Sequence, residues 1–289
     1  MNTIKATFIR HVRYIVTYPI TCLLIFISCG IIIYNSMQEK TVVHALAYIG
    51  GVWLCAFITD IVVIARPKTA VGFPIKKPVK KELWTIIICT VLGASFLVIR
   101  FFTDWEHLSN IARLLTLPLL IFTFQAAQAF IFLFVFKYKF KELGVNLNYW
   151  YLPIILHIVW GVITLLVAPE VSHWQEAYKD YGIIGSLFIG IISAALPEEF
   201  MRLLFQTRIG KATKSIAFGL FMATAIWGAM HIAIGYHQSH QPVTLWSAAL
   251  TISYLVPIGL FWGYLTQRTK SLFPAVMMHG FNLWGLQNF

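Results

Sequence analysis

The sequence predicts an all-α, polytopic membrane protein, built as a bundle of about eight or nine transmembrane helices. The first reason is composition: 59% of the 289 residues are hydrophobic, 11% are charged, and the mean hydropathy is +0.76. A lipid bilayer solvates this much apolar surface, whereas a water-soluble domain could not bury it. The second reason is that the uncharged runs reach the roughly 20 residues that cross a bilayer as a helix. The third is that no short segments of alternating hydrophobicity, typical of membrane β-barrels, occur.

Nine apolar segments are candidate spans. They lie at about 14–35, 42–65, 84–102, 114–136, 150–168, 182–207, 216–235, 243–266 and 271–287. Each is expected to be helical, because backbone polar groups inside lipid must be satisfied within the segment. The last segment is short and contains His279 and Asn282, so the count of spans stays at eight or nine.

The Lys and Arg residues of the loops predict the orientation. With the N-terminus in the cytoplasm, only four of the loop cations face the other side: Lys40, Arg100, Arg113 and Lys179. Because basic loops are retained in the cytoplasm, we expect an integral protein of the bacterial inner (cytoplasmic) membrane with a cytoplasmic N-terminus. The lipid bilayer, and not nucleic acid, is then the expected partner of the basic residues.

The longest polar connection, at 66–83, suggests how the chain is divided. It contains three prolines and a run of lysines, so we expect a basic cytoplasmic linker. Residues 1–65 before it should form a two-span segment. Three further spans are expected at 84–181, followed by a core at 182–289.

The segment AALPEEFMRLLFQ, at 194–206, places Glu198, Glu199 and Arg202 in an apolar span. A charge at the centre of a membrane helix costs roughly 2.5–3.5 kcal/mol on insertion scales, so these residues indicate a functional site or a structural ion pair. Glu198 and Arg202 are four residues apart and share a helix face, so they can pair, whereas Glu199 has no such obvious partner. Pro197 is expected to bend the helix at the acids and open a hydrated cavity.

Two later segments bring polar groups to such a cavity. WGAMH places Trp227 and His231 one helical turn apart, and HGFN places His279 and Asn282 on one helix face. A carboxylate that takes a proton from water, a His that orients the water, and a His and an Asn that stabilise an oxyanion can hydrolyse an acyl bond. In a membrane, a peptide bond is the expected target.

The segments PEEFMRLLFQTRIG, WGAMH and GLFWGYLTQRTKSLFPAVMMHGFN resemble motifs of the CAAX-protease and bacteriocin-processing (CPBP, or Abi) family of intramembrane proteases. The type II CAAX prenyl endopeptidases are relatives within it. The resemblance covers 182–289 and implies that this core is an intramembrane endopeptidase, a hydrolase acting on a membrane-bound peptide or protein substrate. It also implies the catalytic residues Glu198, Glu199, Arg202, His231, His279 and Asn282.

Three details depart from the family pattern. Two residues, and not three, separate the glutamate pair from Arg202. An alignment on the pair makes Glu198 the family's base, whereas an alignment on Arg202 moves Glu198 to the second position, so the base is Glu198 or Glu199. Trp227 replaces the usual Phe, which counts as a mild change. Asn282 follows His279 by three residues where the family has four, but both spacings stay on one helix face.

Two alternatives stay open. The first is a metal enzyme: one of the two glutamates with His231 and His279 could ligate zinc. However, no H-E-x-x-H helix is present and Arg202 would compete with a cation, so we expect no cofactor without excluding zinc. The second is a non-catalytic transporter, immunity protein or scaffold that uses the buried residues for proton relay or helix binding. The internal repeats typical of transporters are not seen.

Residues outside the motifs have structural interpretations. Gly259 and Gly263 form a G-x-x-x-G pair, which predicts close helix packing. Asp60, Gln125 and Gln128 are polar groups in apolar segments. They either line the cavity or bridge helices, and we expect bridging.

Overall fold

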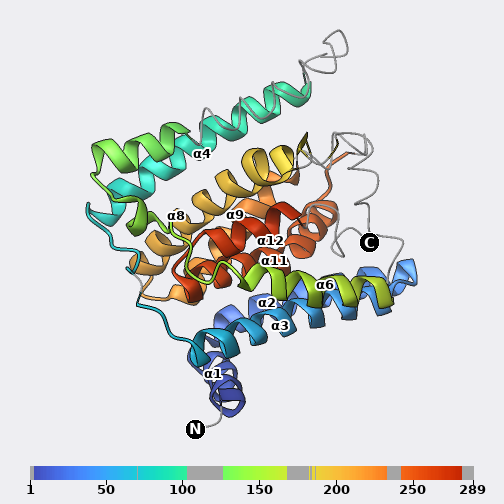
Figure 1. Ribbon diagram of the computed structural model, residues 1–289. Helices are drawn as coiled ribbons and strands as arrows, with labels where there is room; N and C mark the ends of the chain where they lie inside the picture. The colour runs from blue at the N-terminus through green and yellow to red at the C-terminus, as the bar shows by residue number, and fades with distance from the viewer. Residues whose placement is uncertain are drawn as a thin grey trace.

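The computed structural model describes residues 3–69, 71–102, 126–167, 182, 184, 185, 187–232 and 242–281. Over these residues the chain is helical and contains no strand, which confirms the all-α prediction (Figure 1). Among the described residues, three helices are long and apolar enough to cross a membrane: Pro19–Glu39 (α2), Val42–Ala65 (α3) and Leu245–Thr269 (α11). Shorter apolar helices accompany them, so the chain is an integral membrane protein. The count of eight or nine spans stays a prediction.

The first long helix begins later than the predicted segment at 14–35, because a separate helix precedes it. This helix, α1, spans Thr3–Thr17, and α2 starts at Pro19. Proline favours a helix start, since its fixed φ fits the first turn and its missing N–H is not needed there. The two helices meet at Tyr18, whose φ of −129° and ψ of 56° are not helical.

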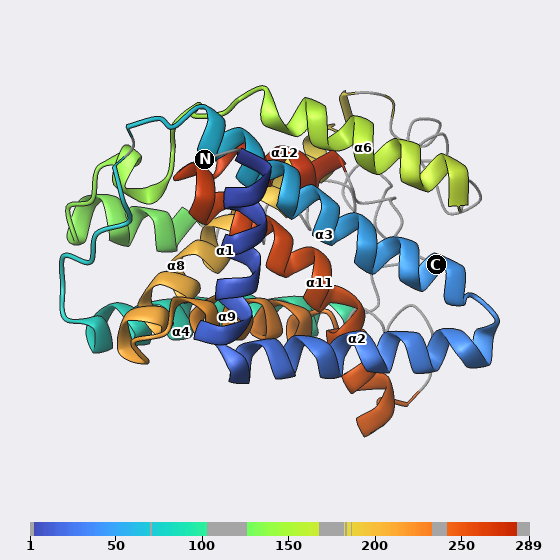
Figure 2. The same ribbon diagram turned by 90° about the horizontal axis from the view of Figure 1, so that it is seen from below.

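Helix α1 is amphipathic and lies at a steep angle to α2 and α3, as both ribbon views show (Figures 1 and 2). Ile4, Phe8 and Val12 repeat every four residues and expose an apolar face. Thr7 and His11 point to the protein instead. An apolar exposed face on a helix that crosses the spanning helices is typical of a helix lying in the membrane interface.

The middle of the chain connects these helices to the core. Helix α3 matches the predicted bounds, and a non-helical connection leads from it to α4, Val79–Phe102. The next described helix, 126–135, ends in a π-helical turn at Ile131–Val135 (η1). A 3₁₀ turn (η2) follows at Phe140–Leu143, and α6 spans Leu152–Val167.

Helix α8, Leu196–Ala212, is the centre of the bundle. It packs against α4, α9 (Ile216–Met230), α11 and α12 (Phe273–Phe281). Figure 1 shows α8, α9, α11 and α12 between α4 on one side and α2, α3 and α6 on the other. This position buries the side chains from Phe200 to Gln206. The charged residues of α8 are therefore surrounded by other helices.

Small residues let the central helices approach closely. A Cβ on Gly263 would lie 2.4 Å from Leu220 of α9, and one on Gly259 would lie 2.7 Å from Thr224. Both glycines of the G-x-x-x-G pair thus face α9 at short range. The prediction of close helix packing is confirmed.

Asp60 joins three helices, as predicted. It is fully buried on α3 and accepts a hydrogen bond from Tyr264 of α11 at 2.6 Å. It also pairs with Arg268 of α11, and its Oδ2 lies 3.1 Å from Nε2 of His11 on α1. Gln125 lies outside the described residues. Gln128 is buried, and its Nε2 has no hydrogen-bond partner among the described residues, so a bridging role for it stays a prediction.

Candidate active site

The two glutamates lie in the first turn of α8, directly after a π-helix. This segment, η4, spans Phe188–Ala195, and Pro197 occupies the start of α8, where its missing N–H is tolerated. The helix distortion expected at Pro197 therefore lies on its N-terminal side, as a change from π- to α-helical hydrogen bonding. π-Helical turns change the direction in which the following side chains point and are frequent at functional sites.

Glu199 is the more buried of the two carboxylates. Its side chain is fully enclosed, and its Oε1 accepts hydrogen bonds from Nη1 of Arg202 and, at 2.8 Å, from Nδ1 of His279. The predicted pair of Glu198 with Arg202 is therefore wrong. Positions three and four residues apart share a helix face equally well. Contacts with neighbouring helices select Glu199 as the partner of Arg202. His279 of α12 donates a hydrogen bond to Glu199, whereas Trp227 of α9 donates one to Glu198.

Glu198 has a different environment. Its side chain is 20% exposed, its Oε2 accepts a hydrogen bond from the indole nitrogen of Trp227, and the same oxygen lies 3.6 Å from Nε2 of His279. The imidazole of His279 thus lies between the two carboxylates, with one nitrogen facing each. Three separate helices, α8, α9 and α12, bring these groups together. The structure therefore brings Glu198, Glu199 and His279 together, and Trp227, in place of the predicted His231, is the contribution of α9.

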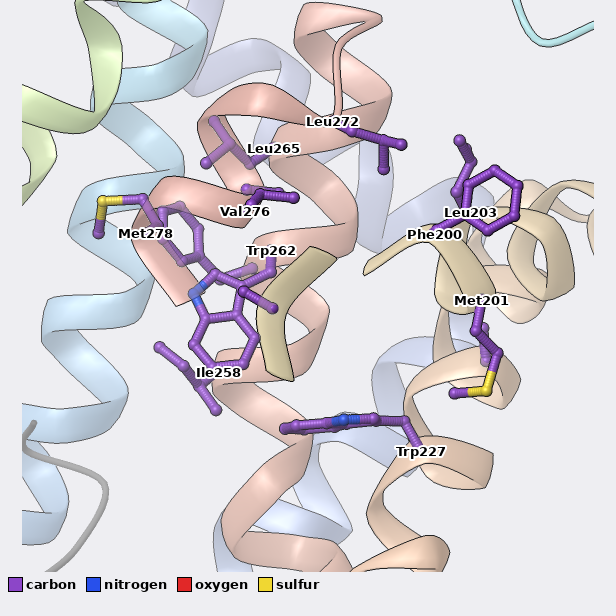
Figure 3. Close-up of a cluster of buried hydrophobic side chains, with 14 of the residues drawn as sticks. Phe200, Met201, Leu203, Trp227, Ile258, Trp262, Leu265, Leu272, Val276 and Met278 are labelled. Atoms are coloured by element: carbon purple, nitrogen blue, oxygen red, sulfur yellow. The ribbon is translucent and has the colours of Figure 1, made fainter. Parts of the chain in front are cut away.

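Two tryptophans enclose the polar groups. The ring of Trp262 stacks on His279, with 3.8 Å between centroids and 13° between planes, and Trp227 meets the same imidazole edge-on at 5.8 Å. The guanidinium of Arg202 lies 4.3 Å from the Trp227 ring centroid. Figure 3 shows both indoles in the buried cluster between α9 and α11. This setting holds Arg202 by cation–π contact and limits water around the ion pair.

His231 lies in the turn that follows α9 and is half-buried. Its Nδ1 is 2.9 Å from the carbonyl oxygen of Trp227, and its ring lies 4.7 Å from the Trp227 ring. Among the described contacts it therefore touches Trp227 and not a carboxylate. Asn282 lies outside the described residues, so its expected place beside His279 stays a prediction.

Two glycines bring α12 into backbone contact with η4, the segment that leads into α8. A Cβ on Gly190 would lie 2.3 Å from the carbonyl oxygen of Gly280, so the backbones of η4 and α12 are in direct contact. Only glycine permits this approach, because a real Cβ does not come so near a backbone atom. His279 precedes Gly280, so the contact sets the distance between its imidazole and the carboxylates.

Sequence reasoning missed three parts of this site. Trp262 lies in one of the motifs, but no role was predicted for it, because its stacking on His279 depends on the fold. The change from Phe to Trp227 counted as mild, yet its indole N–H makes a hydrogen bond that Phe cannot make. Gln206 is fully buried and its Nε2 is 3.4 Å from the carbonyl oxygen of Gly263. Gln206 follows Arg202 by four residues and therefore shares its helix face, which is the sequence signal that could have identified it.

Carboxylates and imidazoles, the polar groups of this site, are also common ligands of zinc. Within the described part of the chain, no group of three or more His, Cys, Asp or Glu side chains is placed to hold a metal ion. In addition, Arg202 already neutralises the buried carboxylate of Glu199. Of the two described carboxylates, that of Glu199 is thus engaged in an ion pair, while that of Glu198 is partly exposed.

Comparison with known proteins identifies a family that the C-terminal region resembles. Residues 181–284 match the family model described as "Type II CAAX prenyl endopeptidase Rce1-like". The preceding residues lie outside this match, while α8, α9, α11 and α12 lie inside it. No curated protein and no solved structure matched the chain. This match supports the assignment of the C-terminal region, which carries both glutamates, Arg202 and His279, to the CAAX protease (CPBP) family as an Rce1-like domain.

Proposed function

We propose that this chain is an intramembrane endopeptidase in which Glu198 activates the attacking water. The observation that carries the proposal is the difference between the two carboxylates. Glu199 is enclosed and held by Arg202 and His279, whereas Glu198 keeps an exposed surface beside the same imidazole. A general base must reach the water from which it takes a proton. Glu199 and Arg202 then position His279 and the first turn of α8.

The reaction follows from this arrangement. The carboxylate of Glu198 takes one proton from water, and the water oxygen forms a bond to the carbonyl carbon of the scissile peptide. The carbonyl π electrons move to oxygen and form an oxyanion. When the oxyanion collapses, the C–N bond breaks and Glu198 returns its proton to the leaving amine. The products are a carboxylic acid and an amine.

We assign to His279 the stabilisation of the oxyanion. Its Nδ1 donates to Glu199, and in the protonated ring Nε2–H is available beside Glu198, where the tetrahedral intermediate would form. We assign Asn282 to the same role from its sequence position. His231 would orient the water through Nε2, because its Nδ1 faces the carbonyl oxygen of Trp227.

Unpaired polar atoms in the site support a polar ligand. Oε2 of Glu199, and Nε and Nη2 of Arg202, are buried and have no hydrogen-bond partner among the described residues. Such atoms destabilise a protein by about 1–3 kcal/mol each when nothing binds them. A peptide backbone or water can satisfy them, which agrees with a hydrated peptidase site inside the bilayer.

The substrate class follows from location. The site lies among helices of an integral membrane protein, so we assign it a membrane-bound peptide or protein. The name of the matched family suggests prenylated C-terminal peptides as a first library to test. We place the chain in the bacterial inner membrane with a cytoplasmic N-terminus, as the loop charges indicate, and we propose that catalysis needs no metal.

A cleavage assay tests the proposal. The purified chain in lipid vesicles is given a labelled library of membrane peptides, with and without prenyl groups, and the products are identified by mass spectrometry. Glu198→Gln should abolish cleavage while the thermal unfolding temperature is kept. Exposed Glu39→Gln on α2 is the matched control and should cleave normally.

Three results would contradict parts of the proposal. Full activity of Glu198→Gln would remove Glu198 as the base. Loss of cleavage with a chelator, restored by zinc, would establish a metal enzyme. A folded chain that cleaves no peptide but carries protons across vesicles would support the non-catalytic alternative.

A further inference from the structure

An apolar cavity of about 430 Å³ lies between α1, α2, α3 and α11, away from the candidate active site. Helix α11 separates the two. Its cavity face is formed by Pro257, Leu260, Phe261 and Tyr264. Its other face carries Gly259, Trp262 and Gly263, which contact the site helices. The two sets are offset by two residues, about 200° around the helix, so they point in opposite directions.

The cavity is built for a hydrocarbon chain. Its walls include Ile25 and Phe26 of α2 and Val52 and Ala56 of α3. Helices α2, α3 and α11 are each long and apolar enough to cross a membrane, so these walls lie at the depth of the lipid tails. Its volume is that of a small-molecule pocket, roughly 300–1,000 Å³. An acyl chain matches both its lining and its surroundings.

One end of the cavity is cationic. Arg10 and His11 of α1 line this end, next to the buried carboxylate of Asp60. Asp60 is shared by Arg268, by His11 at 3.1 Å and by Arg10 at 3.5 Å. One carboxylate cannot neutralise two arginines. Arg10 is the less tightly held of the two and its side chain is 47% exposed, so its charge is available to a ligand.

A third cation adds to the positive field. Lys270 caps the same end of α11, and its pKa is lowered by burial and then by the charges of Arg268 and Arg10. The charges of the two arginines thus disfavour the protonated form of Lys270. A bound anion beside these cations would counter this effect.

We propose that the cavity binds one anionic phospholipid, with an acyl chain between α2, α3 and α11 and its phosphate beside Arg10. The interfacial α1 places Arg10 at headgroup level, while the cavity extends into the hydrocarbon region. The lipid is a resident ligand and not the substrate, because α11 lies between the cavity and His279. The proposal is independent of the peptidase function.

Native mass spectrometry of the full chain tests the proposal. The protein is stripped of lipid in detergent and titrated with phosphatidylglycerol or with phosphatidylcholine of the same acyl chains. One phosphatidylglycerol should be retained in preference to phosphatidylcholine. Arg10→Gln should weaken phosphatidylglycerol binding about fivefold, the effect of one basic residue on an anionic lipid, and leave phosphatidylcholine unchanged. Exposed Arg13→Gln on the same helix is the charge-matched control.

A second variant tests the acyl site. Ala56→Phe fills the cavity and should weaken both lipids, whereas Val43→Phe, at an exposed position of the same helix, should weaken neither. Thermal unfolding without added lipid confirms that each variant is folded. Equal binding of the two lipids, or displacement of phosphatidylglycerol by inorganic phosphate with no effect of Ala56→Phe, would overturn the proposal. Displacement by a farnesylated peptide would also overturn it and identify a substrate site.

Discussion

The indole nitrogen of Trp227, on α9, donates a hydrogen bond to the carboxylate of Glu198, on α8. This contact joins the second motif of the sequence to the first. It orients the proposed base without enclosing it, since the Glu198 side chain is still 20% exposed. It also connects His231 to the site, because His231 packs on the same tryptophan.

Replacement of this donor should reduce catalysis more than binding. Trp227→Phe keeps an aromatic ring against Arg202 but removes the N–H, and a hydrogen bond to a charged group contributes about 1.5–3 kcal/mol. We expect kcat to fall roughly tenfold to a hundredfold with little change in KM. Steady-state kinetics on a cleaved peptide measure this effect. Unchanged kcat with normal folding would show that the hydrogen bond has no role in the reaction.

The ion pair of Glu199 and Arg202 should be a determinant of stability. Glu199→Gln leaves a buried guanidinium without its counter-charge, which typically costs about 3–5 kcal/mol. The double variant Glu199→Gln/Arg202→Met removes both charges and should recover part of this loss. Unfolding of both variants in detergent gives the free energies. If the double variant is less stable than Glu199→Gln, the unpaired charge of Arg202 is not what destabilises the single variant.

The contact between Gly190 and Gly280 should control the position of His279. Gly190→Ala introduces a methyl group where the carbonyl of Gly280 lies, and such overpacking costs about 1–3 kcal/mol. A displacement of His279 by about 1 Å could lower the cleavage rate about a hundredfold. Gly30→Ala on α2, where no atom lies within 4 Å, is the control. It should keep activity and leave stability equal or up to about 1 kcal/mol higher.

Tyr138 should make stability depend on alkaline pH. Its hydroxyl donates to Glu82 at 2.7 Å, and burial followed by this hydrogen bond raises the pKa of Tyr138 from 10.0 to about 12. A folded-state pKa above the unfolded value means that the stabilisation is complete below pH 10 and is lost as pH rises through about 12. The free energy of unfolding should therefore fall across this window in the native chain, and less steeply in Tyr138→Phe. The exposed Tyr34→Phe should follow the native curve; if Tyr138→Phe follows it too, Tyr138 is not the titrating group.

Much of the architecture could be predicted because membrane insertion acts on local sequence. A run such as 42–65 is apolar enough to be a spanning helix whatever surrounds it, and α3 has these bounds. The start of α2 could not be placed as well, since α1 continues the apolar pattern into 14–17 and only the backbone at Tyr18 separates the two helices.

The sequence by itself determined that this protein is a helical membrane protein, and it predicted that acids, histidines and an amide from separate helices gather at one site. Both follow from composition and short-range spacing, which every part of the chain carries locally. Only the tertiary structure decided that Arg202 pairs with Glu199, that Trp262 stacks on His279 and that Glu198 is the less buried of the two carboxylates. Helical spacing allows Arg202 to reach either acid, and the choice depends on His279 and Trp227, which arrive from α12 and α9 and are distant in sequence.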